Sequence, residues 1–352
     1  MENMQRTIAF FEIEPWEESY LRERLDGYDL AFFPGTLDPG DLAQIADARI
    51  LSVFIYSEVR RDMIERLPSL ALVATRSTGF DHIDVAACDQ RGIYVSNVPY
   101  YGENTVAEHT FALMLSLSRN IHKAYLRTLR ADFSLQGLEG FDLKDKTLGV
   151  VGAGSIGLHV IRIAKGFGMT VLAHDPRPNR LIAEVLGFDY VSLDELLPAA
   201  DILTLHAPYT PATHHLINRE TIAKMKRGVL LINTARGGLV DTDALIWGLD
   251  AGIIGGAGLD VLEGEELIKE EKQLIAAPAA EEKLRMLLRH HVLLRREDVV
   301  ITPHVAFYSK EALQRIVEVT VGNILGFIQG QPQNVVNQPR TEEYLFPAAD
   351  ED

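Results

Sequence analysis

Three glycines in the middle of the chain constrain its fold more than any other feature. Gly152, Gly154 and Gly157 follow a short apolar run at residues 147–151 and precede a helical pattern. In this spacing the first glycine permits a tight turn, the second lets another group approach the backbone, and the third lets helix and strand pack closely. The pattern predicts a parallel α/β sheet that binds a dinucleotide at this turn.

The residues around this turn indicate which dinucleotide it takes. Ser155 and Ile156 open the predicted helix, so their amides would meet the negative charge of a pyrophosphate. Asp175 ends the next predicted strand, where a carboxylate accepts hydrogen bonds from the ribose hydroxyls and repels a 2′-phosphate. We therefore predict NAD rather than NADP, with Arg177 as the nearby residue that would weaken this preference.

Apolar runs alternate with helical patterns along the whole chain, which favours α/β architecture, and 352 residues suggest two domains. Asp84 is expected to cap a short helix, Glu103 to begin a long one and Asp241 to cap another. Residues 263–298 resemble a surface insertion that carries a small amphipathic helix. The predicted strands are residues 7–11, 50–55, 70–75, 93–97, 147–151, 170–175, 201–208, 228–236, 255–261 and 299–304.

Composition excludes several classes of partner. With 34 Lys+Arg against 50 Asp+Glu, the net charge is −16, so we expect no nucleic acid and no anionic membrane as partner. The single cysteine, Cys88, excludes an intramolecular disulfide and any multi-cysteine metal site. Adjacent side chains diverge on a helix or strand, so we expect no metal at His214–His215 or His290–His291. The acidic N-terminal region and the lack of a long apolar stretch favour a cytoplasmic location.

Three reactive side chains lie at, or shortly after, the carboxyl ends of predicted strands: Arg236, Glu265 and His304. In open α/β sheets, ligands bind at that edge. An arginine there can hold a carboxylate in a bidentate fork, and a histidine beside a glutamate suits proton transfer near neutral pH. Each also has a purely structural interpretation, as a helix-cap or interface arginine, a surface acid and a buried core imidazole.

Seven separate stretches, in this order, resemble the D-isomer-specific 2-hydroxyacid dehydrogenases. Within that family they are most similar to the bacterial NAD-dependent D-lactate dehydrogenases. The stretches are RSTGFDHID (76–84), NVPYYGENTVAEH (97–109), VVGAGSIG (150–157), HAPYTPATHHLIN (206–218), NTARGGLVDTDAL (233–245), GAGLDVLEGE (256–265) and TPHVAFYS (302–309).

The resemblance implies a role for each residue that matches a family motif. Arg236 would bind the substrate carboxylate and 2-oxo group, and His304 would be the proton donor in reduction and the base in oxidation. Glu265 would hold and tune His304. The substrate carboxylate would also meet the amides of Thr78 and Gly79. Tyr101 would reach the substrate with its hydroxyl and Phe307 would wall the side-chain pocket, while the implied cofactor contacts are Val106, Gly152, Gly154, Ser155, Ile156, Gly157, Asp175, Ala207, Pro208, Thr213, Thr234, Ala235 and Asp260.

The family also implies an architecture of two Rossmann-like or flavodoxin-like parallel-sheet domains with a cleft between them. The substrate domain would comprise residues 1–101 and 305–352, and the NAD-binding domain residues 102–304. A homodimer built on the cofactor domain is expected, and the apolar face of the helix at 103–120 would serve either as core or as the subunit contact.

The predicted activity is reversible hydride transfer between NAD(H) and a small 2-oxo acid, with pyruvate and D-lactate as the expected pair. Another D-2-hydroxyacid dehydrogenase, of the glyoxylate/hydroxypyruvate reductase type, remains an alternative. A phosphoglycerate-type enzyme would need cations for its phosphate, and residues 76–104 offer only Arg76 and Arg91. The alternative outside enzymes is a dinucleotide-sensing module resembling the corepressors of this superfamily.

Overall fold

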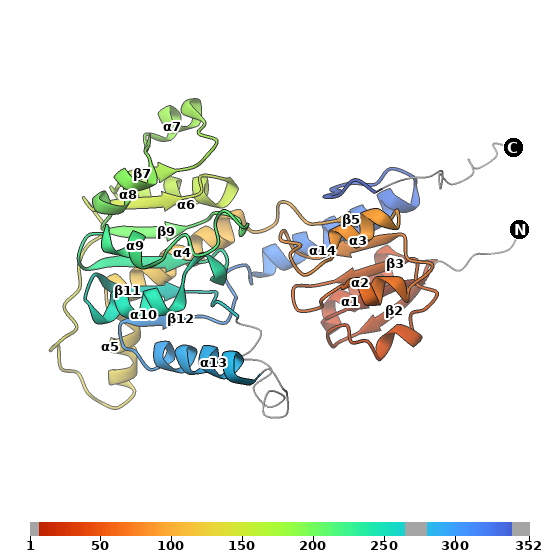
Figure 1. Cartoon of the computed structure of the whole chain (residues 1–352), viewed down its shortest axis with the longest axis horizontal. Helices are drawn as coiled ribbons and strands as arrows, with labels where there is room; N and C mark the ends of the chain where they lie inside the picture. The colour runs from red at the N-terminus through yellow and green to blue at the C-terminus, as the bar shows by residue number, and fades with distance from the viewer. Residues whose placement is uncertain (1–6, 265–279, 340–352) are drawn as a thin grey trace, which may run out of the picture. The chain divides into compact units, whose positions relative to one another are not determined.

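The computed structural model describes residues 7–264 and 280–339 and divides the chain into two compact units. Unit 1 is Met1–Tyr101 with Ser309–Asp352, and unit 2 is Gly102–Tyr308 (Figure 1). The second boundary follows Tyr308, four residues later than the boundary expected after residue 304. The amides of Val305 and Ala306 bond to the carboxylate of Asp260 in unit 2, at 2.9 and 2.8 Å, so these residues stay with that unit.

Unit 1 is built on a five-stranded parallel sheet with the order β2-β1-β3-β4-β5. This is the flavodoxin-like order. Its elements are β1 Thr7–Phe11, α1 Pro15–Arg24, β2 Asp29–Phe33, β3 Ile50–Val53, α2 Arg61–Glu65, β4 Leu72–Thr75, α3 Val85–Gln90, β5 Tyr94–Ser96 and α14 Lys310–Ile328. Strand β2 was not predicted; it lies at the edge of the sheet and lacks the fully buried pattern of β3 and β4.

Alternate residues of the unit 1 strands enter two separate cores. Ile8 and Phe10 of β1 pack with residues of α1 and α14, whereas Ala9 and Phe11 pack with residues of α2 and α3. Because helices cover both faces, the central strands consist almost entirely of apolar residues. Asp84 caps α3 as predicted, its side chain accepting from the amide of Ala87 at 2.8 Å.

Unit 2 contains a seven-stranded parallel sheet with the order β12-β11-β10-β9-β6-β7-β8. Its first six strands in chain order follow the Rossmann order, to which β12 adds an edge strand. The elements are α4 Glu103–Ser118, α5 Ile121–Thr128, β6 Thr147–Val151, α6 Ser155–Gly166, β7 Thr170–His174, α7 Arg180–Leu186, β8 Asp189–Tyr190, α8 Leu193–Ala199, β9 Ile202–Leu205, α9 Arg219–Ala223, β10 Val229–Asn233, α10 Thr242–Asp250, β11 Ile254–Leu259, α13 Ala280–Leu294 and β12 Val299–Ile301.

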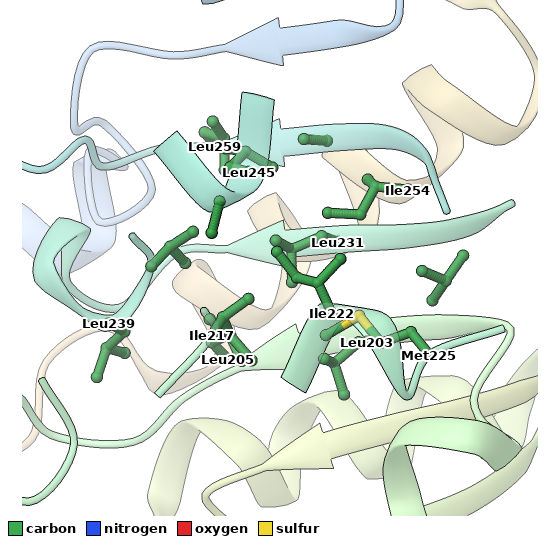
Figure 2. Packing of buried hydrophobic residues seen from close by; sticks show 14 of the residues in the cluster. Leu203, Leu205, Ile217, Ile222, Met225, Leu231, Leu239, Leu245, Ile254 and Leu259 are labelled. Atoms are coloured by element: carbon green, nitrogen blue, oxygen red, sulfur yellow. The ribbon is translucent and has the colours of Figure 1, made fainter. Parts of the chain in front are cut away.

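One face of this sheet packs against α8, α9 and α10, in a core where Leu203 and Leu231 meet Ile222 and Leu245 (Figure 2). The other face packs against α4 and α6, through strand residues such as Leu148. Both predictions for the surrounding helices hold, since Asp241 caps α10 and an amphipathic α13 lies within the predicted insertion.

Helix α4 decides between the two alternatives, core or subunit contact, that were left open for its apolar face. Its apolar side is buried within unit 2, where Phe111 and Met114 join the core and Leu113 lies against Gly258 of β11. This face is therefore core and is not available to a second subunit.

In the described part of the chain, no helix combines the length and apolar character that a membrane crossing requires.

Candidate functional site

The glycine turn after β6 has the geometry that its spacing requires. Gly152 has φ +92°, and a Cβ there would lie 2.7 Å from the amide nitrogen of Ala207. A Cβ on Gly157 would lie 2.1 Å from the carbonyl oxygen of Gly152, so only glycine allows α6 to start this close to the strand. A Cβ on Gly154 would meet nothing within 4 Å. That open space lies at the start of α6, beside the exposed Ser155 and the half-buried Ile156, and fits an approaching pyrophosphate.

The turn lies where the strand order of the sheet reverses, between the neighbours β6 and β9. Dinucleotides bind at such a switch point. Ala207 and Pro208 lie two and three residues after the end of β9, and the hydroxyl of Thr213 donates to the carbonyl of Pro208 at 2.7 Å, which closes this loop. In the same loop, loss of water around the ring of His206 lowers its pKa to about 3, so this imidazole is neutral.

Asp175 follows β7, the strand next to β6. Its carboxylate accepts from the amide of Ala153 at 2.9 Å and from the amide of Arg177 at 2.8 Å. These two bonds fix the carboxylate against the glycine turn. Each carboxylate oxygen can accept a further hydrogen bond, so the arrangement fits the ribose hydroxyls of a dinucleotide.

Arg236, Asp260 and His304 lie three, one and three residues after the ends of the adjacent strands β10, β11 and β12. Arg236 is half-buried, and the buried side chain of Asn233 fixes its loop. The amide group of Asn233 donates to the carbonyl of Arg236 at 2.9 Å and accepts from the amide of Ala235 at 3.1 Å. The structure thus brings a guanidinium and an imidazole to one edge of one sheet.

His304 has φ +54°, an unusual backbone conformation for a residue other than glycine. Its amide donates to the carbonyl of Asp260 at 2.9 Å. The ring of Phe307 meets the His304 ring edge-on, with 6.3 Å between centroids, and Phe307 is buried. Glu265, the third predicted reactive residue, lies outside the described residues.

Two further predicted cofactor residues, Val106 and Thr234, are buried. Thr234, at the end of β10, shares a hydrogen bond of 3.0 Å with Thr110 of α4. The hydroxyl of Thr110 donates to the carbonyl of Val106 at 2.8 Å. The side chain of Thr234 is therefore engaged within unit 2.

In unit 1, the turn after β4 carries Thr78 and Gly79. Ser77 donates its hydroxyl to the carbonyl of Gly79 at 2.6 Å, Thr78 donates to the carbonyl of Val98 at 2.8 Å, and Asn97 donates to the carbonyl of Thr78 at 2.8 Å. These three bonds make the turn rigid. None of them uses the amides of Thr78 and Gly79, so these amides suit an anion. Tyr101 ends this part of the unit, and its carbonyl accepts from Arg315 of α14 at 2.8 Å.

The two arginines considered for a substrate phosphate are engaged with the backbone. Arg76 is buried and donates to the carbonyls of Phe11 and Glu12 at 2.7 and 2.8 Å. Arg91 donates to the carbonyl of Leu67 at 3.4 Å and that of Pro68 at 3.3 Å. Both side chains therefore serve the fold of unit 1.

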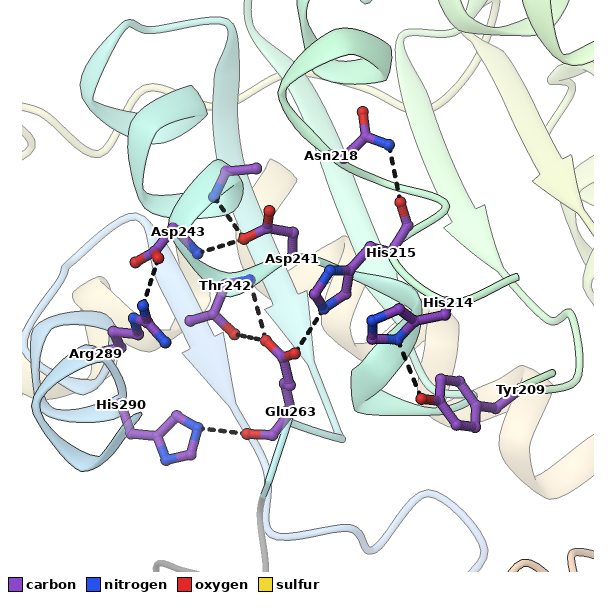
Figure 3. A network of polar contacts seen from close by, with 11 residues as sticks. Tyr209, His214, His215, Asn218, Asp241, Thr242, Asp243, Glu263, Arg289 and His290 are labelled. Carbon is purple, nitrogen blue, oxygen red and sulfur yellow. Dashed lines mark hydrogen bonds and ion pairs between the residues drawn. The ribbon is translucent and has the colours of Figure 1, made fainter. Parts of the chain in front are cut away.

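A polar network around Glu263 holds the chain just before Glu265 (Figure 3). The Glu263 carboxylate lies 2.6 Å from Nε2 of His215 and accepts the hydroxyl of Thr242 at 2.8 Å, while its carbonyl lies 2.8 Å from Nε2 of His290. The rings of His214 and His215 are stacked, with 3.7 Å between centroids, so the expectation that they diverge was wrong. The reason is that His215 has φ +48° in a turn and belongs to neither a helix nor a strand.

The glycine turn and the residues at the ends of β10, β11 and β12 lie in the region matched by one family model. Residues 111–306 match the D-isomer specific 2-hydroxyacid dehydrogenase, NAD binding domain. The chain belongs to this dehydrogenase family. Unit 2 carries its NAD-binding domain.

Relatives of the 2-hydroxyacid dehydrogenase family match over nearly their full length. A 2-hydroxyacid dehydrogenase homolog of Haemophilus influenzae is 40% identical over 94% of this chain and 98% of its own. The D-lactate dehydrogenase of Escherichia coli is 36% identical over 92% of this chain and 97% of its own. The crystal structure of D-lactate dehydrogenase from Aquifex aeolicus complexed with NAD and lactic acid has a TM-score of 0.84 at 38% identity, covering 92% of this chain and 96% of that one.

Several residues that fix the chain around Arg236, Glu263 and His304 were not predicted from the sequence. These are Asn233, whose bonds span two and three positions, Glu263, whose bond to Thr242 spans 21, and the hydrogen-bond partners of Asp260, which lie up to 46 positions from it. The signal available was weak, because Asn233 and Glu263 stand inside the quoted family stretches without any local pattern. In the described residues, no group of three or more His, Cys, Asp or Glu side chains has the arrangement of a metal site.

Proposed function

We propose that this dehydrogenase reversibly reduces a small 2-oxo acid to the D-2-hydroxy acid with NADH, with pyruvate and D-lactate as its substrate pair. The observation that carries the proposal is the edge of the unit 2 sheet. There Arg236 and His304 follow strands on either side of β11, and the NAD turn follows β6 of the same sheet. A cation for the acid and a proton carrier thus accompany the cofactor turn.

In this proposal, Arg236 binds the substrate carboxylate and the 2-oxo oxygen, because its planar fork suits two acceptors. His304 gives a proton to that oxygen during reduction and takes it back during oxidation. Bound NADH supplies the hydride to C2 of the acid. We assign to Glu265 the holding of His304, and we assign unit 1 to the substrate and unit 2 to the cofactor.

We assign the substrate carboxylate to the amides of Thr78 and Gly79 as well, and the Tyr101 hydroxyl to the substrate. Phe307 supports the choice of a small side chain. Its buried ring stands edge-on to the ring of His304, so it limits the room beside the reacting carbon. A methyl group, as in pyruvate, needs less space there than the side chains of hydroxypyruvate, 2-oxoisocaproate or phenylpyruvate.

A panel of 2-oxo acids tests the substrate. We expect the highest kcat/KM for NADH oxidation with pyruvate, and lower values with glyoxylate, hydroxypyruvate, 2-oxoisocaproate and phenylpyruvate. In the reverse direction, D-lactate but not L-lactate should reduce NAD. A preference for glyoxylate or hydroxypyruvate would favour the glyoxylate/hydroxypyruvate reductase alternative. NADH binding without turnover of any acid would favour the dinucleotide sensor.

We further propose a homodimer formed through unit 2. With the face of α4 buried, support comes from α5 and the residues that follow it, where six large apolar side chains are each more than half exposed. These are Ile121, Tyr125, Leu126, Leu129, Phe133 and Leu135. A cluster of this kind marks an interaction surface.

Sedimentation velocity tests this assembly. The wild type should sediment as a dimer, and the double variant Phe133→Glu with Leu135→Glu should sediment as a monomer, because two charges would enter the contact. Leu181→Glu is the control, since Leu181 is 70% exposed but lies on α7. A monomeric wild type, or a dimer that survives the double variant, would refute the proposed contact.

A further inference from the structure

The buried carboxylate of Asp260 holds the segment that carries His304. Its two oxygens accept the amides of Val305 and Ala306 at 2.9 and 2.8 Å, and its carbonyl accepts the amide of His304. The unusual φ of +54° at His304 persists because these bonds fix His304 and the two residues after it. The direction of the His304 ring therefore depends on the place of Asp260.

A third donor reaches the same carboxylate from Thr302. The Thr302 hydroxyl donates to Oδ1 of Asp260 at 2.5 Å, and its oxygen lies 3.0 Å from Nε2 of His109. A hydroxyl has one hydrogen, and here it points to Asp260. Nε2 of His109 must therefore carry a hydrogen and donate it to Thr302, which fixes the tautomer of His109. The same nitrogen lies 3.5 Å from Oδ1 of Asp260.

His109 and its neighbour Thr110 reach two different loops from one turn of α4. Thr110 spends its own hydrogen on the carbonyl of Val106, so the hydroxyl of Thr234 donates to Thr110 at 3.0 Å. Thr234 lies in the loop that leads to Arg236. The same helical turn thus contacts the segments of both Arg236 and His304.

We propose that His109 is a positioning residue for His304. It holds the Thr302 hydroxyl on Asp260, and through Asp260 it fixes the backbone that carries the His304 ring. Thr110, on the same helical turn, contacts the loop of Arg236. The inference rests on the proposed function, in which His304 carries the proton. His109 itself touches neither substrate nor cofactor in this role.

His109→Leu tests the proposal in the full-length enzyme. We expect kcat for 2-oxo acid reduction to fall about ten-fold, the scale of one lost hydrogen bond, with KM changed less than about two-fold. Affinity for NADH, measured by fluorescence titration, should not change. His109→Gln should keep kcat within about three-fold of the wild type, because its amide can donate to Thr302 in place of Nε2.

Thr302→Val is the second variant, which removes the hydroxyl with little change of shape. It should lower kcat to the same extent, and His109→Leu combined with Thr302→Val should be no slower than either alone, because both break one connection. His122→Leu is the matched control. This histidine bonds to the carbonyls of Ser116 and Glu297 instead, at 3.0 and 2.9 Å, and its loss should leave kcat unchanged.

The outcomes separate this inference from the proposed function. Failure of the wild type to reduce any 2-oxo acid, or full turnover by His304→Gln, would refute the function. If those tests hold but His109→Leu and Thr302→Val keep the wild-type kcat, the positioning role is wrong. It is also wrong if NADH affinity falls with kcat, or if His109→Gln is as slow as His109→Leu, since either would mean that His109 only supports the fold.

Discussion

At the carboxyl edge of its sheet, unit 1 ties strand ends together with a buried cation, whereas unit 2 does so with a buried carboxylate and a buried amide. Arg76 donates to the carbonyls of Phe11 and Glu12, which follow or end β1. Asp260 instead accepts backbone amides, and Asn233 bonds to both an amide and a carbonyl.

The cation of unit 1 needs a counterion, which is Glu17, with 3.8 Å between Nε and Oε1. Burial lowers the pKa of Arg76 and raises the pKa of Glu17, so for both groups the loss of water outweighs their mutual attraction. The pair therefore fixes geometry more than it adds stability. In unit 2 the described donors to the Asp260 carboxylate are the amides of Val305 and Ala306 and the hydroxyl of Thr302, and Nε2 of His109 lies 3.5 Å from Oδ1. The difference teaches that a strand end can be fixed either by a buried ion pair or by hydrogen bonds from the backbone.

The largest effect on stability is expected for the variant Arg76→Met. Removing one partner of a buried pair leaves the charge of Glu17 uncompensated and should destabilise unit 1 by about 3–5 kcal/mol. The two tryptophans report on the units separately, since Trp16 lies in α1 and Trp247 in α10. In a Trp247→Phe background, urea unfolding followed by Trp16 fluorescence should shift to lower urea.

Two controls accompany this measurement. Arg76→Met combined with Glu17→Gln should recover part of the loss, because the stranded charge is gone. Arg60→Met removes an exposed arginine, paired with Glu58 at 3.1 Å, and should cause a far smaller change. Equal effects of Arg76→Met and Arg60→Met would show that the buried pair does not hold unit 1 together.

The next largest effect on stability is expected for the variant Asn233→Ala in unit 2. It removes the partners of the Arg236 carbonyl and the Ala235 amide and should cost about 2 kcal/mol, read by Trp247 in a Trp16→Phe background. KM for the 2-oxo acid should rise because the loop of Arg236 loosens. Asn179→Ala is the control, since Asn179 caps α7 and should affect stability alone. An unchanged KM in Asn233→Ala would separate the loop from substrate binding.

Acid should affect the two units in opposite directions at their buried groups. His206 has a pKa lowered to about 3 by burial, against 6.5 ordinarily, so below about pH 6.5 the unfolded chain takes up a proton that the folded unit 2 refuses. The free energy of unfolding of unit 2 should therefore fall with falling pH, by at most about 1.4 kcal/mol per pH unit from this group. The raised pKa of Glu17 has the opposite sign, because the folded unit 1 takes up its proton first.

His206→Gln should flatten the pH dependence read by Trp247 between pH 6 and 4 and leave that read by Trp16 unchanged. Glu17→Gln should change only the latter. Parallel pH dependences of the two reporters in all three proteins would contradict the contrast between the units.

The smallest expected effect is at Cys88 of unit 1. Burial raises the pKa of this thiol to about 12, so at pH 8 it is neutral and should react with iodoacetamide far more slowly than in urea. Mass spectrometry of the native protein should find it almost unmodified. Faster labelling in Arg76→Met would link the buried pair to the opening of unit 1, and rapid labelling of the wild type would contradict the burial.

Much of the fold was predictable because it rests on local rules. Alternating apolar runs located most strands, and Asp84 and Asp241 were found as caps because a cap acts within a few residues. Strand β2 was missed since edge strands carry a weaker burial pattern. The stacking of His214 on His215 was missed because a positive φ leaves little trace in a sequence without glycine at that position.

The sequence by itself determined the two parallel sheets, the NAD turn and the family, because backbone sterics and hydrophobic periodicity act over short stretches. Only the tertiary structure decided which side chains fix the loops of Arg236 and His304. Asp260 meets Ala306 across 46 positions and His109 meets Thr302 across 193, and no local pattern encodes such pairs. Their partners are chosen by the order of β10, β11 and β12 in the sheet and by α4 packing against it, since a buried polar group must find its bond wherever the fold brings one.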